Sequence, residues 1–187
     1  MNPTEKKTRD YFASNDIILA KIPEHKGKTP DFEGDEILVE VKEVALYEAE
    51  GLQPDSTYNA VKNNLKNAAR QFRDYDSKHS KKHIVVIFSN EIIKDDIYSV
   101  WTGKFSPDIP KRIFHGGMIL SPEHKRHIDV IVWFKRISDS APKYVWTTNL
   151  TIQKYFSETV FRNGLESYYC YNPNSKCLVN RPKMIGG

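Results

Sequence analysis

The chain has 187 residues, 39% of them hydrophobic and 28% charged, a composition that suits one globular domain and excludes a repeat or low-complexity protein. The formal net charge of +4 is a mild basic excess, which favours approach to a polyanion without establishing it. The first residues argue against a signal peptide, no apolar run reaches membrane length and there are only two cysteines, so we expect a cytoplasmic protein with reduced thiols and no membrane partner.

The first ninety residues predict a helix followed by three strands, a second helix and a fourth strand. In the first helix, Asn2 can cap, Pro3 suits the first helical position and Glu5 completes a capping box. The second helix is indicated by apolar residues at three- and four-residue intervals, and the strands by β-branched runs and turn residues. The predicted elements cover residues 3–14, 16–22, 29–32, 37–44, 58–77 and 83–88. This order indicates an α/β fold with a mixed sheet flanked by helices.

Residues 91–187 give weaker signals. Helices are predicted over 91–100 and 151–162, and strands over 117–120, 127–134 and 143–148. The strand at 127–134 alternates apolar and polar residues, whereas the aromatic tail after Ser167 is expected to be irregular. We therefore interpret residues 1–187 as a single domain, with a core at about 3–90 and C-terminal α+β additions over 91–187.

Charged side chains gather on one face of the predicted hairpin at residues 29–44. If the hairpin turns at residues 34–35, Asp31 pairs with Leu38. Because side chains alternate between the two faces of a strand, Asp31, Glu40 and Lys42 then project from the same face. A turn of two or four residues gives the same parity, so the grouping does not depend on the turn length.

Two carboxylates on a partly buried face need compensation, and a divalent cation supplies it. Mg²⁺ prefers hard oxygen ligands such as those of Asp31 and Glu40. An ion there can bind a phosphate oxygen and activate a water, while Lys42 orients that water or neutralises developing charge. The alternative is a strand with one wet face, because Glu-x-Lys is a weak signal by itself.

The pattern Pro30-Asp31, eight residues, then Glu40-Val41-Lys42 resembles the PD-(D/E)XK nuclease superfamily, which has the restriction-endonuclease-like fold. That fold has an αβββαβ core, the order predicted for about half of this chain. The resemblance implies a Mg²⁺- or Mn²⁺-dependent deoxyribonuclease, a phosphodiester hydrolase whose partner is DNA. It also implies that Asp31, Glu40 and the Val41 carbonyl hold the metal and that Lys42 is catalytic. Many relatives act as dimers, so a homodimer is an open option.

A second pattern, Gln71-x-x-x-Tyr75, resembles the motif of RecB-like and lambda-exonuclease-like members. The four-residue spacing puts both side chains on one edge of the predicted helix. The resemblance implies that Gln71 orients the catalytic site and that Tyr75 contacts nucleic acid. Lys28 and Arg73 are further candidate contacts to nucleic acid. The alternative is that Gln71 is a solvated polar residue, that Tyr75 ends the core stripe, and that the basic residues form a solvated face.

Many members of the superfamily take another acid from the first helix, and Glu5 is the candidate here. Its place in the capping box accounts for it equally well and is favoured, with Glu24 and Glu33 as weaker alternatives. His124 and His127 have a spacing seen in metal sites, yet are expected to be surface histidines. Two alternatives to a nuclease stay open: a nucleic-acid-binding module on the same fold that does not cleave, and an unrelated α/β protein with a charged surface hairpin.

Overall fold

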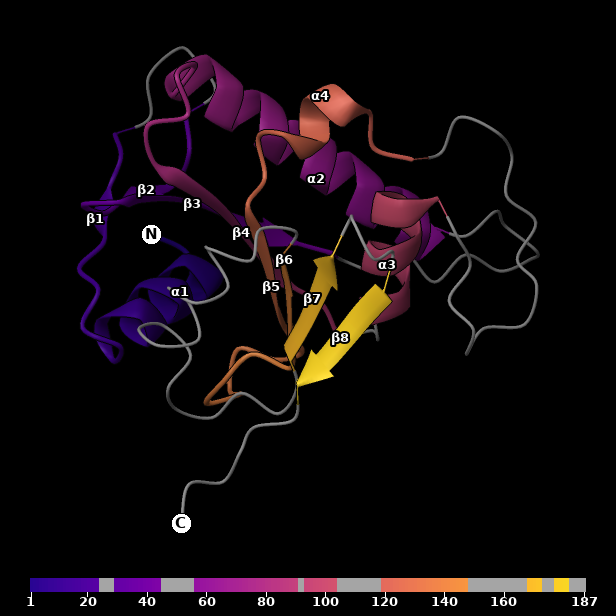
Figure 1. The fold of residues 1–187 in the computed structure, drawn as a ribbon. Coiled ribbons are helices and arrows are strands. Elements are labelled where there is room, and N and C mark those ends of the chain that lie inside the picture. The colour runs from indigo at the N-terminus through magenta and orange to yellow at the C-terminus, as the bar shows by residue number, and fades with distance from the viewer. Residues whose placement is uncertain are drawn as a thin grey trace.

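The strands of this protein form one mixed sheet with helices on both faces (Figure 1). The computed structural model describes residues 1–23, 29–44, 56–90, 93–103, 119–147, 168–172 and 177–181. In the described part the sheet has eight strands, which lie side by side in chain order from β1 to β8. The predicted α/β class is therefore confirmed.

The first six elements follow the predicted order of helix, three strands, helix and strand. The helices are α1 (Pro3–Ala13), α2 (Ser56–Tyr75), α3 (Lys94–Thr102) and α4 (Pro122–Lys125). The strands are β1 (Ala20–Lys21), β2 (Phe32–Glu33), β3 (Ile37–Glu43), β4 (Lys82–Phe88), β5 (Val130–Phe134), β6 (Tyr144–Thr147), β7 (Tyr168–Asn172) and β8 (Cys177–Arg181).

The start of α1 has the predicted capping box. The Asn2 side chain accepts a hydrogen bond of 2.8 Å from the Glu5 backbone N–H, and the Asn2 backbone N–H donates to Glu5 Oε2 at 3.2 Å. These two bonds satisfy amide groups that the first turn of a helix otherwise leaves without partners.

Two element predictions are wrong. The buried strand predicted at 16–22 is reduced to the two exposed residues of β1, because the chain first makes a turn in which Asp16 has a φ of +62°. The tail after Ser167 is not irregular, since β7 and β8 form an antiparallel pair and β7 is parallel to β6. Strand pairing with distant residues decided this tail, and local propensity does not report it.

The hairpin register differs from the predicted one by two residues. Phe32 lies opposite Val39 and Glu33 opposite Leu38, and the Gly34 N–H donates to the Ile37 carbonyl at 2.9 Å across a four-residue turn. The turn is centred one residue later than predicted, which shifts the pairing by an even number of residues, so the faces on which side chains project are unchanged. Beyond the hairpin, β3, β4 and β5 are parallel neighbours.

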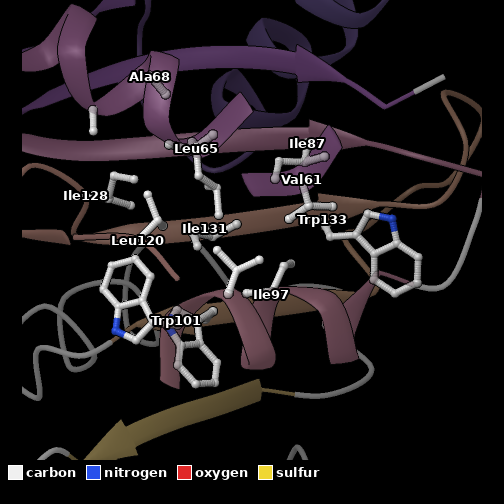
Figure 2. Close-up of a cluster of buried hydrophobic side chains, with 14 of the residues drawn as sticks. Val61, Leu65, Ala68, Ile87, Ile97, Trp101, Leu120, Ile128, Ile131 and Trp133 are labelled. Atoms are coloured by element: carbon white, nitrogen blue, oxygen red, sulfur yellow. The ribbon is translucent and has the colours of Figure 1, made fainter. Parts of the chain in front are cut away.

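The sheet separates two apolar cores. Figure 2 shows the core between the sheet and α2 and α3, where Leu65 and Trp101 meet Ile131 of β5. On the opposite face, Tyr11 and Phe12 of α1 cover the other sides of β3, β4 and β5. All residues of β5 are buried, so the alternation predicted for this strand is wrong within its observed bounds.

Several predictions lie outside the described residues, among them Lys28, Glu24, most of the loop at 46–57 and the helix at 151–162. Of the strand predicted at 117–120, only residues 119–120 are described, and they are not in a strand. Among the described helices, none is both long enough and apolar enough to cross a bilayer.

Candidate metal and catalytic site on the hairpin

The hairpin brings Asp31 beside Glu40. The Asp31 backbone N–H donates to the Val39 carbonyl at 3.1 Å, and Asp31 Oδ2 accepts the Val41 backbone N–H at 2.8 Å. These bonds hold the Asp31 carboxylate close enough to Glu40 for its negative charge to raise the pKa of Glu40. The Asp31 side chain is 21% exposed, so its carboxylate is accessible to solvent at the edge of the site.

Glu40 is a buried carboxylate with one unsatisfied oxygen. Its side chain is 2% exposed, Oε1 forms an ion pair with the Lys42 ammonium, and Oε2 is buried without a hydrogen-bond partner. Burial is the main reason that the pKa of Glu40 is raised to about 7; the Lys42 ammonium opposes the rise and the charge of Asp31 adds to it. An unsatisfied buried oxygen of this kind is a position that a cation can stabilise.

Gln71 connects α2 to this group. The Lys42 ammonium donates to Gln71 Oε1 at 3.1 Å, and Gln71 Nε2 donates to the Thr29 carbonyl at 2.9 Å. Gln71 is therefore a partly buried member of the cluster and not a solvated residue of the helix. Its two bonds hold the Lys42 ammonium against Glu40.

The backbone of Val41 faces the Asp31 side of β3. The Val41 N–H donates to Asp31 Oδ2 at 2.8 Å. Since the N–H and C=O of one strand residue point toward the same neighbouring strand, the Val41 carbonyl also points to the Asp31 side and away from β4. The backbone oxygen that the sequence pattern suggests as a ligand thus lies on the side where the carboxylates meet.

Lys21 of β1, which no sequence pattern identified, lies between two acids. Its ammonium contacts Glu5 Oε1 at 2.9 Å and Asp31 Oδ1 at 3.0 Å. Burial favours a lower pKa for Lys21, but hydrogen bonds to Glu5 and Asp31 raise it overall. Glu5 is thus joined to the hairpin only through an ammonium, while its other oxygen caps α1. No local signal could have found Lys21, because the contact depends on how α1 packs at the sheet edge.

The candidate nucleic-acid contacts are placed apart from one another. Tyr75, which is 41% exposed, donates to Glu33 Oε2 at 3.0 Å and so faces the hairpin turn. Arg73 instead pairs with Asp74 at 2.9 Å and with Glu123 of α4 at 3.1 Å. Arg73 therefore points toward α4, and the structure does not bring it together with Tyr75 and Gln71.

A hollow of about 230 Å³ lies elsewhere, past the end of β3, and is lined by residues that include Glu43, Ser89, Lys135 and Arg136. Its lining contains neither Asp31 nor Glu40. The carboxylate–lysine group is therefore a partly open cluster at the hairpin and is separate from this hollow.

The prediction that His127 is a surface residue is wrong, because His127 is buried, with 9% of its surface exposed. It packs near His79 and His83. His124, by contrast, lies in the short helix α4, where its ring nitrogen contacts the Ser121 hydroxyl at 2.6 Å. The spacing of His124 and His127 was thus a poor guide, since their partners come from other segments.

Comparison of the chain with models of known protein families, with curated proteins and with solved structures gives no match.

Proposed function

We propose that this chain is a metal-dependent nuclease that hydrolyses phosphodiester bonds of DNA, with a restriction-endonuclease-like core over about residues 3–90. The observation that carries the proposal is the buried Glu40 carboxylate, whose free Oε2 lies in a cluster with Asp31 and the Lys42 ammonium. The observed order of α1, three strands, α2 and β4 supports the same core.

The donor set fits Mg²⁺ or Mn²⁺. Asp31, Glu40 and the Val41 carbonyl offer hard oxygens of the kind these ions prefer, and Glu40 Oε2 lacks another partner. When bound, such an ion lowers the pKa of a coordinated water and withdraws charge from a phosphate oxygen. Glu5 can join the set only if Lys21 leaves its carboxylate.

Lys42 supplies positive charge at a fixed position. An ammonium has three N–H donors, and Glu40 Oε1 and Gln71 Oε1 accept two of them. The third can donate to a phosphate oxygen or to the attacking water, where it stabilises the negative charge of the transition state. Gln71 contributes by positioning this ammonium.

Tyr75 offers an exposed ring at the hairpin end of α2. Aromatic side chains stack on bases with little sequence preference, at about 1–3 kcal/mol for each base. We assign Tyr75 to nucleic-acid contact on this basis. Arg73 is a weaker candidate because two carboxylates already engage its guanidinium.

A cleavage assay tests the proposal. The purified chain is incubated with plasmid, linear and single-stranded DNA and with RNA, in Mg²⁺, Mn²⁺ or EDTA. We expect DNA cleavage that requires the metal and falls by at least about a hundredfold in Asp31→Asn, Glu40→Gln and Lys42→Ala.

Matched controls come from the same strands. Glu36→Gln and Lys82→Ala alter an ion pair of 3.3 Å outside the cluster and should leave cleavage unchanged. Metal-independent binding of DNA without cleavage supports the non-cleaving module instead. If the chain neither binds nor cleaves DNA and Mg²⁺ does not stabilise it, both the nuclease and the non-cleaving module are overturned.

A further inference from the structure

Three histidines from separate segments meet near the amino-terminal ends of β4 and β5. His79 follows α2, His83 lies in β4 and His127 follows α4. Each offers one ring nitrogen, and these atoms lie within 4.8 Å of one another. Imidazole nitrogen suits Zn²⁺ and similar transition-metal ions better than Mg²⁺. We propose that these histidines bind a transition-metal ion of the Zn²⁺ class, at a second site separate from the hairpin.

His127 supplies the first independent support. Its residue is 9% exposed, and its Nδ1 is buried without a hydrogen-bond partner. A buried nitrogen left unsatisfied destabilises a fold by about 1–3 kcal/mol, so a ligand for it is favoured.

His83 supplies a second independent support for the metal site. Its Nδ1 faces the His127 carbonyl oxygen at 3.2 Å, and its Nε2 faces Asp76 Oδ2 at 3.2 Å. Both facing atoms are acceptors, whereas a neutral imidazole has only one N–H. An ion bound by His83 Nε2 beside the Asp76 carboxylate removes this mismatch.

Asp129 orients the site from outside. Its Oδ2 lies 2.7 Å from His79 Nε2 and also accepts the His83 backbone N–H at 2.7 Å. A carboxylate on one ring nitrogen holds that nitrogen protonated and leaves the other free for a metal. His79 therefore presents Nδ1. Together, Asp76 and Asp129 carry the charge that balances a divalent cation.

Binding requires one ring to move. Two nitrogens on one tetrahedral Zn²⁺ lie roughly 3.4 Å apart, and the His79 and His83 rings are stacked with centroids 4.2 Å apart. His83 is held on its other face by Phe72, at 4.6 Å. His79 has a φ of +52° in a turn, and its side chain is 32% exposed. His79 is thus the ligand that leaves the stack to close the site.

Direct metal binding tests the proposal. Protein freed of any histidine tag is stripped with a chelator and dialysed against Zn²⁺, Co²⁺ or Mg²⁺. We expect one tightly bound Zn²⁺ for each chain and a visible absorption of tetrahedral Co²⁺. Zn²⁺ bound to the histidines should raise the Tm, whereas Mg²⁺ should not act at these histidines. His79→Ala should weaken Zn²⁺ binding by at least about tenfold, and His124→Ala is the matched histidine control.

Each outcome is informative because the two sites are tested separately. Asp31→Asn should leave Zn²⁺ binding intact, whereas His79→Ala should leave Mg²⁺-dependent cleavage intact. Absence of tight Zn²⁺ binding overturns the proposal. So does Zn²⁺ binding that is lost in Asp31→Asn, and so does an equal affinity for Zn²⁺ in His79→Ala and His124→Ala. His79 is partly exposed, so its variant is expected to fold, and circular dichroism verifies this.

Discussion

Lys42 and Gln71 are joined by a hydrogen bond of 3.1 Å that links β3 to α2 across 29 residues of sequence. The other end of the Gln71 amide donates to the Thr29 carbonyl at 2.9 Å. One side chain therefore ties the helix to the Lys42 ammonium and to the segment before β2, and the position of the ammonium depends on the packing of α2.

Replacing Gln71 with alanine should lower the rate of DNA cleavage by about tenfold, because a hydrogen bond to a charged group is worth about 1.5–3 kcal/mol. Steady-state kinetics with saturating Mg²⁺ measure this loss, which we expect in kcat. Asn67→Ala removes an exposed amide from the same helix and should have no effect. Equal losses of kcat in both variants would mean that the integrity of α2 as a whole, and not the Gln71 hydrogen bond, supports cleavage.

Metal binding at the hairpin should depend on pH near 7. Burial raises the pKa of Glu40 to about 7, and only the ionised carboxylate is a good ligand for Mg²⁺. The Mg²⁺ concentration that gives half-maximal activity should therefore fall as the pH rises through 7. Titrations of activity with Mg²⁺ on either side of this pH test the expectation, which a pH-independent midpoint contradicts.

The metal-free protein should lose stability as the pH rises. The pKa of Glu40 is about 7 in the folded state, against 4.5 for an unperturbed carboxyl, so the folded state binds this proton more tightly than the unfolded state. Its contribution is complete below about 4.5 and is lost as the pH passes 7. The loss is at most about 3 kcal/mol. Urea unfolding in EDTA measures it, and Glu40→Gln should abolish this part of the pH dependence.

Removing the Lys21 ammonium should tighten Mg²⁺ binding at the hairpin. The ammonium contacts both Asp31 and Glu5, so it competes with a cation for their oxygens. Isothermal titration of Lys21→Ala should give a lower Kd for Mg²⁺ than that of the unaltered chain. Lys6→Ala, which removes a more exposed lysine of α1, serves as the control. Weaker binding in Lys21→Ala would instead mean that Lys21 supports the site.

The capping box should stabilise the whole domain. Asn2→Ala removes the side chain that accepts the Glu5 N–H at 2.8 Å, and loss of such a cap costs about 1 kcal/mol. Urea denaturation at neutral pH measures the change in the free energy of unfolding. Because Glu5 also contacts Lys21, Glu5→Gln should be more destabilising at low salt than at high salt, whereas the Asn2→Ala effect should not depend on salt.

The sequence by itself determined the features that depend on local periodicity. Strand alternation predicts that Asp31, Glu40 and Lys42 share one face, and the parity of the pairing is the same although the register differs from the predicted one by two residues. The capping residues and the spacing of apolar residues in α2 were enough for the two main helices. These patterns are readable because each arises from residues only a few positions apart.

Only the tertiary structure decided the electrostatics and the partners. The raised pKa of Glu40 arises from its burial within the fold, and the contact of Lys21 with two acids arises from the packing of α1 at the sheet edge. The histidine cluster joins three separate segments, and His79 also contacts Asp129, which is 50 positions away. Burial and long-range contact depend on which segments the chain brings together, and no local pattern records that choice.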